Sequence, residues 1–441
     1  MPLAVTPRAS VLGSLALLLG LALMLPGCLG TPYTHPPGAH CAAFLHDAEG
    51  GVVSDTIARI AARRAAARGP AAPVTINMLI LSGGGKYGAY GAGFLSGWSR
   101  READGQPVDM RRQDVDIVTG ISTGSLLASY AAAGNSVPAA DPARAAADSD
   151  MRAAYQVSDK DLFVTHGLVG SLGSNALADP AKGLQVRVEA LARAYMPKMR
   201  ALADGRAVLV GLVNLDNGRF YIADLVEIAR SDAANAVECY REVLLASSAV
   251  PLQFPPRYID GSPYVDGGVR FGTFLGRDFA ALAGGGGGEP AMTINFRAIV
   301  NGNLSANDPA DNAAQAAACD AAELDAVPST CAAVKNRLLN IAERAAGNIL
   351  ADQIYRDSAY RLYRDLQSAG LLGSGAYAYV SNRDIADHHC KRATGDTFDR
   401  VYMDCLSAIG IEEGTAQHWQ SFADLPKLRR PVVRPSAGGG S

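Results

Sequence analysis

The sequence predicts an α/β fold, in which strands and helices alternate along the chain. Val74 to Leu81 is a continuous apolar run of strand length, as expected for a buried parallel strand, and it ends in a cluster of glycines. Asp114 to Thr119 is a second short strand that ends in another glycine-framed turn. A helix is expected after each turn, over about 88–101 and about 124–133. Strand, glycine turn and helix, twice over, are typical of α/β architecture.

The later elements follow the same alternation. A helix over about 181–196 precedes a third apolar strand, and Asp216-Asn217-Gly218 is a hairpin turn signal that leads into a short strand. Residues 134–180 have a mixed composition and are expected to connect elements or to form a lid. The remaining expected elements are a helix over 52–68, the strands Ala207 to Val213 and Phe220 to Ile222, a helix over 232–247, the strand Met292 to Val300, a helix over 333–368 and a late strand Tyr377 to Val380.

The composition describes a globular protein. The chain has 441 residues, of which 49% are hydrophobic and 19% are charged, enough for one large core or two smaller ones. The net charge of −3 gives no electrostatic case for a nucleic-acid partner. Arg63, Arg64 and Arg68 lie on the Ala-rich helix over 52–68, and we interpret them as a solvated face.

The N-terminus is interpreted as a signal peptide over 1–27. Val11 to Leu25 is an uncharged apolar stretch, shorter than a transmembrane helix usually requires. It ends in Leu25-Pro26-Gly27-Cys28, which resembles a bacterial lipoprotein signal, so that Cys28 would carry the lipid. The alternative is a plain secretory signal. The mature chain is therefore expected to be exported and anchored at the outer membrane, with a periplasmic or secreted protein as the alternative.

The cysteines agree with an exported chain. Without Cys28 there are six, and an even number in an oxidising compartment suggests disulfides. Their connectivity stays open at this point; pairing sequence neighbours gives Cys319–Cys331, Cys390–Cys405 and, by remainder, Cys41–Cys239. No cysteine or histidine cluster has the spacing of a zinc site, and no cofactor or metal is implied.

The domain organisation expected from these segments has five parts. They are a signal peptide over 1–27, a tether and N-terminal helix over 28–70, a catalytic domain over 71–300, a helical extension packed on it over 301–434 and a disordered tail over 435–441.

A serine motif follows the second strand. Gly120-Ile121-Ser122-Thr123-Gly124 is a GxSxG turn between strand and helix, which exposes a serine on a tight elbow. Gly120 and Gly124 are needed because the backbone there is strained and crowded. The helix that follows directs its N-terminal N–H groups towards the site. A serine hydroxyl in this place is a candidate nucleophile.

A glycine loop, Gly83-Gly84-Gly85-Lys86-Tyr87-Gly88, occupies the equivalent place after the preceding strand. Consecutive glycines free the backbone N–H groups to hold the oxyanion of a tetrahedral intermediate, an effect worth roughly 3–4 kcal/mol per donor. The GxGxxG spacing also fits a dinucleotide-binding turn formally, and tight helix–strand packing is a further alternative.

An aspartate motif, Asp266-Gly267-Gly268, supplies a candidate base. Alone it is an ordinary turn signal. A carboxylate within hydrogen-bond reach of the serine and partly desolvated has its basicity raised enough to take a proton.

Together the three motifs resemble the patatin-like phospholipase family, which uses a glycine-rich oxyanion loop, a GxSxG serine and a DGG or DGA aspartate as a Ser–Asp dyad. The segment from Ala246 to Pro256, with Ser247-Ser248 and Pro255-Pro256, is similar to that family's approach to its aspartate. The similarity covers about 74–300. It implies a three-layer α/β/α fold with a mostly parallel central sheet.

The resemblance also implies roles for particular residues. Ser122 would be the nucleophile, Asp266 the base, and Gly83, Gly84 and Gly85 the oxyanion hole, with Gly88, Gly120, Gly124, Gly267 and Gly268 supporting the motifs. The expected substrates are phospholipids or other acyl esters, at a membrane surface reached through lipidated Cys28, and not nucleic acid. One departure is that the family usually has Arg or Lys before the last loop glycine, where this chain has Tyr87 preceded by Lys86.

Two alternative functions remain open. The chain order Ser122, Asp266, then His388 or His389 would also suit an α/β-hydrolase triad. The second alternative is a non-catalytic lipoprotein that binds lipid or a partner protein on a hydrolase scaffold.

Overall fold

The computed structural model describes most of the chain after the signal region. The described residues are 34–68, 73–103, 115–135, 141–166, 175–203, 205–274, 292–302 and 351–422, with positions 282 and 304. The chain divides into two units after Pro36, and all elements below belong to the unit that begins at Pro37. The signal peptide, the segment 301–330 apart from three positions, the start of the expected helix 333–368, and the tail 435–441 lie outside the described residues.

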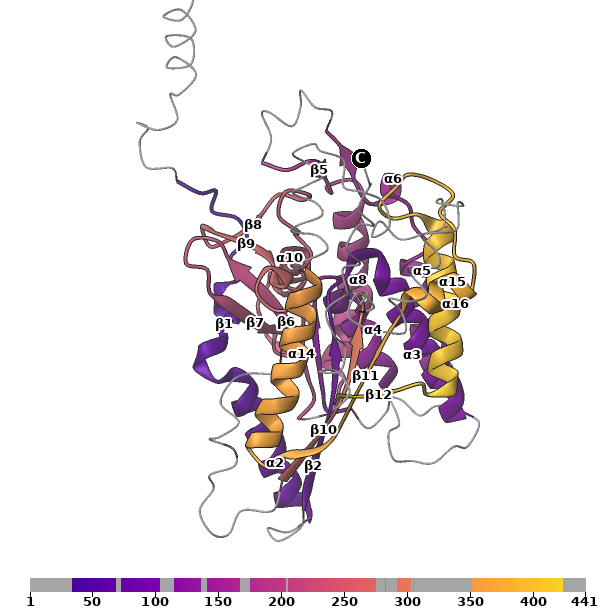
Figure 1. Ribbon diagram of the computed structural model, residues 1–441. Helices are drawn as coiled ribbons and strands as arrows, with labels where there is room; N and C mark the ends of the chain where they lie inside the picture. Colours follow the sequence, from indigo (N-terminus) through magenta and orange to yellow (C-terminus); the bar gives the residue numbers. More distant parts are fainter. Residues whose placement is uncertain are drawn as a thin grey trace, which may run out of the picture. The chain divides into compact units, whose positions relative to one another are not determined.

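Ten of the described strands form one sheet, with β2 and β3 near its centre. Figure 1 labels its strands β6, β2, β10 and β11. The pairs β11–β10, β10–β2, β2–β3 and β3–β6 are parallel, whereas the outer pairs are antiparallel. In spatial order the path is β1 (His46–Asp47), β7 (Phe220–Asp224), β6 (Ala207–Asn214), β3 (Ile117–Ile121), β2 (Val74–Leu81), β10 (Met292–Val300), β11 (Leu372–Tyr379) and β12 (Gln420–Ser421); β9 (Ser262–Asp266) pairs with β6 and with β8 (Arg257–Ile259).

Helices cover both faces of this sheet, so the predicted three-layer α/β/α fold is present. On one face the buried apolar side chains pack against α2 (Val52–Arg68) and α14 (Ala351–Ser368). The opposite face is covered by α3 (Gly88–Ala103), α4 (Thr123–Asn135), α5 (Pro142–Ala154), α8 (Leu184–Arg200), α9 (Leu225–Arg230), α10 (Ala236–Ser247) and α16 (Arg400–Ala416). The smaller elements are α6 (Asp159–Leu162), α15 (Asn382–Asp387), the pair β4 (Val164–Thr165) and β5 (Ala178–Asp179), and the short 3-10 turns η1 (Ala42–Phe44), η2 (Ala48–Gly50), η3 (Gly85–Tyr87) and η5 (Gly267–Val269).

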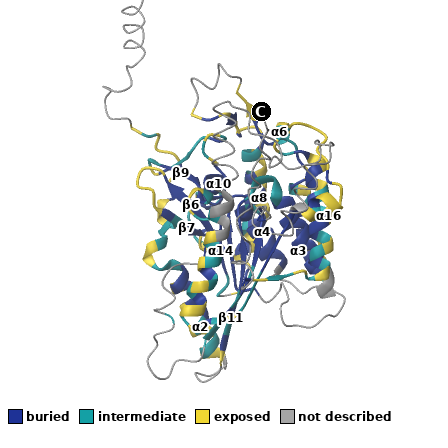
Figure 2. Cartoon of the chain, in the orientation of Figure 1, coloured by how far each residue is buried: buried dark blue, intermediate teal, exposed yellow. Residues whose placement is uncertain are grey.

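The alternation of side chains along β2 explains these two cores. Leu79 and Leu81 point to the α3 side, whereas Ile76, Met78 and Ile80 point to the α2 side, and all five are buried. Because both faces of the strand are covered from Met78 to Leu81, its sequence is apolar at every position there, whereas the half-buried positions 75 and 77 are Thr and Asn. Figure 2 shows this burial along the sheet and on the inner sides of the helices.

Most expected elements lie where the sequence places them. The strands Val74–Leu81 and Met292–Val300 and the helix Val52–Arg68 have the expected bounds. The Asp216–Gly218 turn joins β6 to β7 as an antiparallel hairpin, as predicted. The short helix α9 was not expected: Asp224 begins it by accepting the N–H of Val226 at 2.9 Å.

The C-terminal segment differs from the expected helical extension. Its strand β11 pairs in parallel with β10, and β12 pairs with β11, so this segment widens the central sheet as well as covering it. Helix α16 packs along α3. The strand was underestimated in the sequence because Gly373, Ser374 and Gly375 lack the apolar pattern of a buried strand.

Two further expectations have a clear outcome. The disulfides Cys41–Cys239 and Cys390–Cys405 are present, and Cys319–Cys331 lies outside the described residues. Arg64 is not part of a solvated face: its guanidinium forms an ion pair with buried Asp116 and donates to the Thr75 carbonyl. This contact ties α2 to the sheet.

Within the described ranges, no helix combines the length and hydropathy that crossing a bilayer requires.

Candidate active site

Ser122 occupies a strained turn between β3 and α4. Its φ of 54° lies in the left-handed region, which is unfavourable for a residue with a side chain. Its carbonyl accepts the Ser125 N–H at 2.9 Å and the Ser125 hydroxyl at 2.6 Å, which begins the helix. Such strain is kept where it holds a functional group in place. The sequence therefore builds the predicted nucleophile elbow.

The elbow is close-packed against the neighbouring strand, which explains why glycine flanks the serine. A Cβ at Gly124 would lie 2.2 Å from the Leu81 carbonyl oxygen and 2.5 Å from that of Ser82. Both are backbone atoms that cannot move aside. The first turn of α4 therefore lies directly beside the start of the glycine loop.

Ser247, at the C-terminal end of α10, fixes the elbow from the other side. Its hydroxyl accepts the Ser122 N–H at 3.0 Å and donates to the Gly211 carbonyl in β6 at 2.8 Å. Ser247 is fully buried. Ser247 was not predicted as a site residue; its signal in the sequence is its place in the segment that precedes the aspartate motif.

The glycine loop leaves β2 in a conformation that only glycine adopts easily. Gly84 has a φ of 139°, and a Cβ there would lie 1.2 Å from the Asn301 carbonyl oxygen. Within the described part of the chain, no group accepts a hydrogen bond from the N–H of Gly84 or Gly85. These N–H groups are therefore available to a substrate oxygen, as an oxyanion hole requires.

Asn301, which follows β10, holds the base of this loop. Its N–H donates to the Ser82 hydroxyl at 2.7 Å, and its side-chain amide donates to the Ser82 carbonyl at 2.8 Å. Asn301 is fully buried. It was not predicted as a site residue, because it acts on the loop from the end of a distant strand.

Asp266 lies at the end of β9, which pairs with β6 through Leu212. Its Oδ1 accepts the Gly268 N–H at 2.7 Å, and the carboxyl is buried with an exposed fraction of 4%. Burial raises the pKa of Asp266 to about 6, although hydrogen bonds from the Ser122 hydroxyl and the Gly268 N–H oppose the rise. The structure therefore brings Ser122 and Asp266 together.

The second oxygen of the Asp266 carboxyl has no firm partner. Oδ2 of Asp266 is buried and has no hydrogen bond of ordinary geometry among the described groups, although the Ser122 hydroxyl is close enough to lower the pKa. Catalytic hydrogen bonds are often loose before substrate binds and tighten in the complex. A buried carboxylate oxygen without a firm partner is well placed to accept a proton.

Aromatic side chains from distant segments surround the glycine loop. Phe398 lies 3.8 Å from where a Gly85 Cβ would be, and its ring is 6.3 Å from that of Phe163. Phe163 in turn lies 5.5 Å from Phe254. Phe163 and Phe254 are buried, so the apolar segment around residue 163, which the sequence left as either lid or core, is core at this position.

Tyr87, preceded by Lys86, stands in the loop where the resemblance predicts a basic residue, and both side chains lie near Tyr402. The Lys86 ammonium lies 5.6 Å from the ring centre of Tyr87 and 5.7 Å from that of Tyr402. These are cation–π distances. Burial raises the pKa of the Tyr402 phenol, and the neighbouring Tyr87, which hydrogen-bonds Tyr402, raises it further. The C-terminal segment thus packs directly on the residues that replace the family's basic position.

The histidines of the triad alternative are engaged elsewhere. His388 contacts the Asp384 carbonyl at 2.9 Å and Glu412 at 3.1 Å through its two ring nitrogens. His389 lies in a turn after α15 with a φ of 51°. Among the described contacts, neither joins Ser122 or Asp266. Nor do three His, Cys, Asp or Glu side chains gather as around a metal ion within the described ranges.

A strained serine, a buried carboxyl beside it and backbone N–H groups after the preceding strand thus lie together in an α/β fold. Residues 79–275 match the family model described as patatin-like phospholipase. This supports a hydrolase that acts on lipid esters.

The similarity to a solved structure is low. The crystal structure of VipD from Legionella pneumophila is similar over 80% of this chain and 68% of that one, with 12% identity and a TM-score of 0.36. No curated protein matches the chain.

Proposed function

We propose that this chain is an exported lipid acyl hydrolase that cleaves fatty-acyl esters of phospholipids or related lipids with a Ser122–Asp266 dyad. The observation that carries the proposal is the pairing of a serine in a strained elbow with a buried carboxyl whose pKa responds to that serine hydroxyl. No third titratable group is needed, because a carboxylate with a raised pKa is a competent base near neutral pH.

Acylation begins when Asp266 accepts the proton of the Ser122 hydroxyl. The Ser122 oxygen then bonds to the ester carbonyl carbon, and the carbonyl electrons move to its oxygen. The N–H groups of Gly84 and Gly85, with that of Gly83 as a further candidate, stabilise this oxyanion. When the intermediate collapses, the bond to the alkoxide breaks, and Asp266 returns its proton to the departing alcohol.

Deacylation repeats these steps with water. Asp266 takes a proton from water, and the hydroxide adds to the carbonyl carbon of acyl-Ser122. Collapse breaks the bond to the Ser122 oxygen, which recovers its proton from Asp266, and the fatty acid leaves. The helix dipole of α4 favours negative charge at its N-terminus throughout.

The location is part of the proposal. We place the protein outside the cytoplasm, on the outer membrane through a lipid on Cys28. The two disulfides in the described chain support an oxidising compartment. Mass spectrometry of the mature N-terminus tests this proposal: a diacylated or triacylated Cys28 supports it, and an unmodified terminus at another residue contradicts it.

The decisive experiment compares hydrolysis of phospholipid vesicles and of a short-chain chromogenic ester by wild type, Ser122→Ala and Asp266→Asn. Both variants should fall by at least about a thousandfold, because each removes a member of a unit that acts together. A fluorophosphonate probe should label wild type and not Ser122→Ala.

The chain offers matched controls. Asp224 is also buried and its pKa is also raised to about 6 by burial, but it accepts the N–H groups of Val208 and Val226 instead of contacting the serine. Asp224→Asn should therefore keep activity. Ser129→Ala, on the helix α4 that follows Ser122, is the control for serine loss. A wild type that cleaves neither substrate would favour the non-catalytic lipoprotein, and loss of activity in a His388→Ala and His389→Ala double variant would favour the triad.

A further inference from the structure

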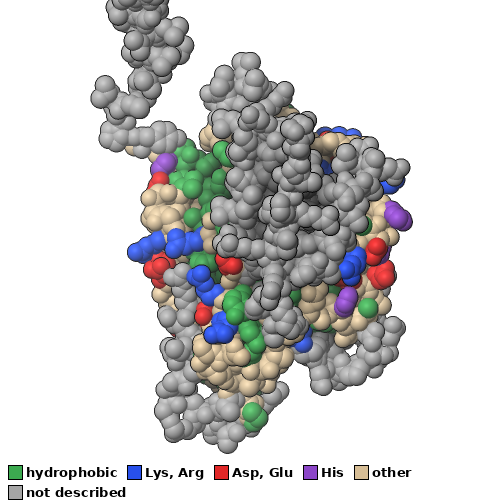
Figure 3. All heavy atoms as spheres, in the orientation of Figure 1, with side chains coloured by type: hydrophobic (Ala, Val, Ile, Leu, Met, Phe, Trp, Pro, Cys, Tyr) green, Lys and Arg blue, Asp and Glu red, His purple; other side chains and the backbone are tan. Residues whose placement is uncertain are grey.

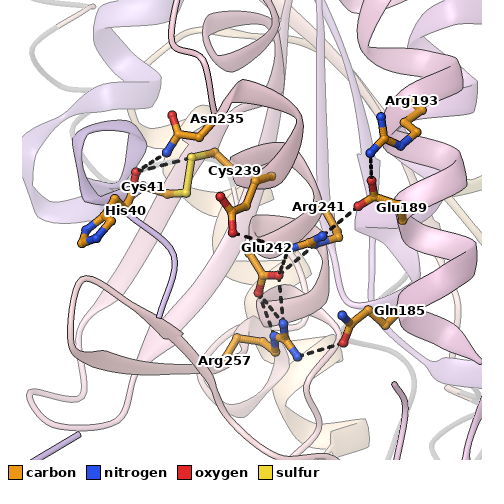
Figure 4. Close-up of polar contacts among 11 residues, drawn as sticks. His40, Cys41, Gln185, Glu189, Arg193, Asn235, Cys239, Arg241, Glu242 and Arg257 are labelled. Atoms are coloured by element: carbon orange, nitrogen blue, oxygen red, sulfur yellow. Dashed lines mark hydrogen bonds and ion pairs between the residues drawn. A yellow bond between two sulfur atoms is a disulfide. The ribbon is translucent and has the colours of Figure 1, made fainter. Parts of the chain in front are cut away.

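A short loop over 248–256 joins α10 to β8 and is clamped at its base. Glu242 on α10 is buried and accepts two hydrogen bonds from Arg257 at the start of β8, at 2.8 and 2.9 Å. Arg241 contacts the same carboxylate at 2.8 Å (Figure 4). A buried carboxylate shared by two guanidinium groups is costly to separate, so both ends of the loop are held in fixed positions.

The tip of this loop displays an apolar side chain in an unfavourable backbone conformation. Leu252 has a φ of 73° and is 69% exposed, and Val250 beside it is 38% exposed. A leucine gains nothing for folding in such a place, because its side chain is not buried and its backbone is strained. Strain of this kind points to a function of the side chain outside the fold.

A second segment extends the apolar surface. The Leu177 N–H donates to the Leu252 carbonyl at 2.8 Å, and the Ala178 N–H donates to that of Gln253 at 3.0 Å. Along this segment Ala176 and Ala178 are buried, whereas Leu177 is 45% exposed. On the paired strand β4, Val164 lies on the same face and is 56% exposed. Val164, Leu177, Val250 and Leu252 thus form one apolar surface, which we call the loop patch.

The loop patch is continuous with the candidate active site. The Ala249 carbonyl accepts the Asp266 N–H at 3.0 Å, only three residues before Leu252. Behind the loop, Phe254 and Phe163 are the first members of the aromatic row that reaches Phe398 beside Gly85. Apolar side chains therefore lead from the surface to the oxyanion loop.

The N-terminal tether restricts where a membrane can be. Gly261, in the turn between β8 and β9, donates its N–H to the Pro37 carbonyl at 2.7 Å, and Ala39 pairs with Tyr258 in the same hairpin. Pro37 lies nine positions after Cys28, and nine residue steps span at most about 32 Å. A lipid on Cys28 would keep this hairpin near the bilayer. Figure 3 shows hydrophobic side chains gathered over the β8–β9 region at the upper left.

We infer that the loop patch docks on a phospholipid bilayer and presents the Ser122 site to the membrane. The inference rests on the proposed function, because it concerns how the same site reaches its substrate. We assign a bilayer and not a protein partner to the loop patch for two reasons. The short tether would hold this region near a membrane, and the aromatic side chains between the loop patch and Gly85 suit the acyl chain of a lipid. An exposed apolar surface of this kind is typical of membrane contact.

The test measures binding to phosphatidylcholine vesicles by flotation, using the full mature chain with Cys28→Ser, so that no lipid anchor contributes, and Ser122→Ala, so that no substrate is consumed. Leu252→Gly removes the apolar side chain and also suits the positive φ, so the variant should fold at least as stably. We expect its vesicle affinity to fall about tenfold or more. Leu177→Ser should give a smaller loss in the same direction.

The control is Val401→Ser, which removes an apolar side chain of similar exposure, 54%, from α16, outside the loop patch. It should bind vesicles like the parent. With Ser122 restored, Leu252→Gly should lose hydrolysis of vesicles but keep hydrolysis of a soluble short-chain ester.

Unchanged vesicle affinity in Leu252→Gly would overturn the inference. So would a dimer in light scattering that Leu252→Gly dissociates, because the loop patch would then be covered by a second copy. A protein that binds vesicles through Leu252 but hydrolyses nothing would contradict the proposed function alone.

Discussion

The domain over 79–275 and the C-terminal segment over 351–422 contribute different things to the same site. The first supplies the polar groups: Ser122, Asp266 and the glycine-loop N–H groups. The second supplies cover, with Phe398 against Gly85 and Tyr402 against Tyr87. Reactive groups come from a fold shared by a family, whereas their surroundings come from a segment outside the family match. The surroundings of the candidate site therefore depend on contacts between the two segments.

The two regions are also held by different means. The domain places its groups through strand ends and hydrogen bonds, such as those of Ser247 and Asn301. The C-terminal segment is held by close backbone approach: a Cβ at Gly410 on α16 would lie 2.2 Å from the Tyr90 carbonyl of α3. Tyr90 also donates to Glu413, whose pKa burial raises to about 7.

Apart from substitutions of Ser122 and Asp266 that test the proposed dyad, the largest effect is expected for Gly84→Ala. The added methyl would overlap the Asn301 carbonyl and take a φ of 139°, so the loop must move. Activity on a soluble ester should fall by about a hundredfold or more, as for loss of an oxyanion donor. The control is Gly218→Ala, which has a φ of 66° but open space around it and should keep activity. Equal activity of the two variants would contradict our assignment of the loop.

The next effect concerns Asp266 and pH. Because the base must be ionised, kcat/KM should rise with pH through about 6 and then level off. The folded pKa is raised above the value of 3.8 for an unfolded chain, so the group's contribution to stability is present below pH 3.8 and is lost as the pH rises through about 6.

Asp266→Asn should therefore raise the free energy of unfolding at pH 8 by up to about 3 kcal/mol, which corresponds to roughly two pKa units. At pH 4 the gain should largely disappear. Denaturant titrations at the two pH values measure it. If the variant is instead less stable than wild type at pH 8, hydrogen bonds stabilise the buried Asp266 carboxylate more than we infer.

Gly410→Ala tests the C-terminal segment. Overpacking against the Tyr90 carbonyl should lower the free energy of unfolding by about 1–3 kcal/mol, measured by thermal or urea unfolding. The folded fraction should still hydrolyse a soluble ester, because no polar group of the site changes. Gly395→Ala, in the same segment but with nothing within 4 Å, is the control and should not alter stability much.

The smallest effect is expected for His388→Ala. Its contact with Glu412 is at the surface, and such pairs contribute about 0–1 kcal/mol. The Glu412 hydrogen bond raises the pKa of His388, so its small contribution is present at low pH and lost above neutrality. Ester hydrolysis should stay within about twofold of wild type. A loss of a hundredfold would point to a histidine in the mechanism.

These comparisons also show what the sequence could predict. Strand-length segments rich in apolar residues marked β2 and β10 to the residue, and glycine spacing marked the elbow and the loop, because both signals are local. The position of Phe398 beside Gly85 has no local signal: it depends on how α16 packs against α3. The same is true of Asn301 and Ser247, whose roles arise from contacts between strand ends and helix ends.

The Cys41–Cys239 disulfide also determines how a pulling force at the N-terminus is transmitted into the fold. If the chain is pulled at Cys28, the tension enters at Pro37 and reaches Cys41 four residues later, where a covalent bond passes it to α10. Only the few hydrogen bonds around Ala39 lie in between. The disulfide thus bypasses the chain between Cys41 and Cys239, which begins with the two-residue strand β1. An enzyme moored in this way can be dragged by a moving membrane without its active site being unravelled from the mooring end.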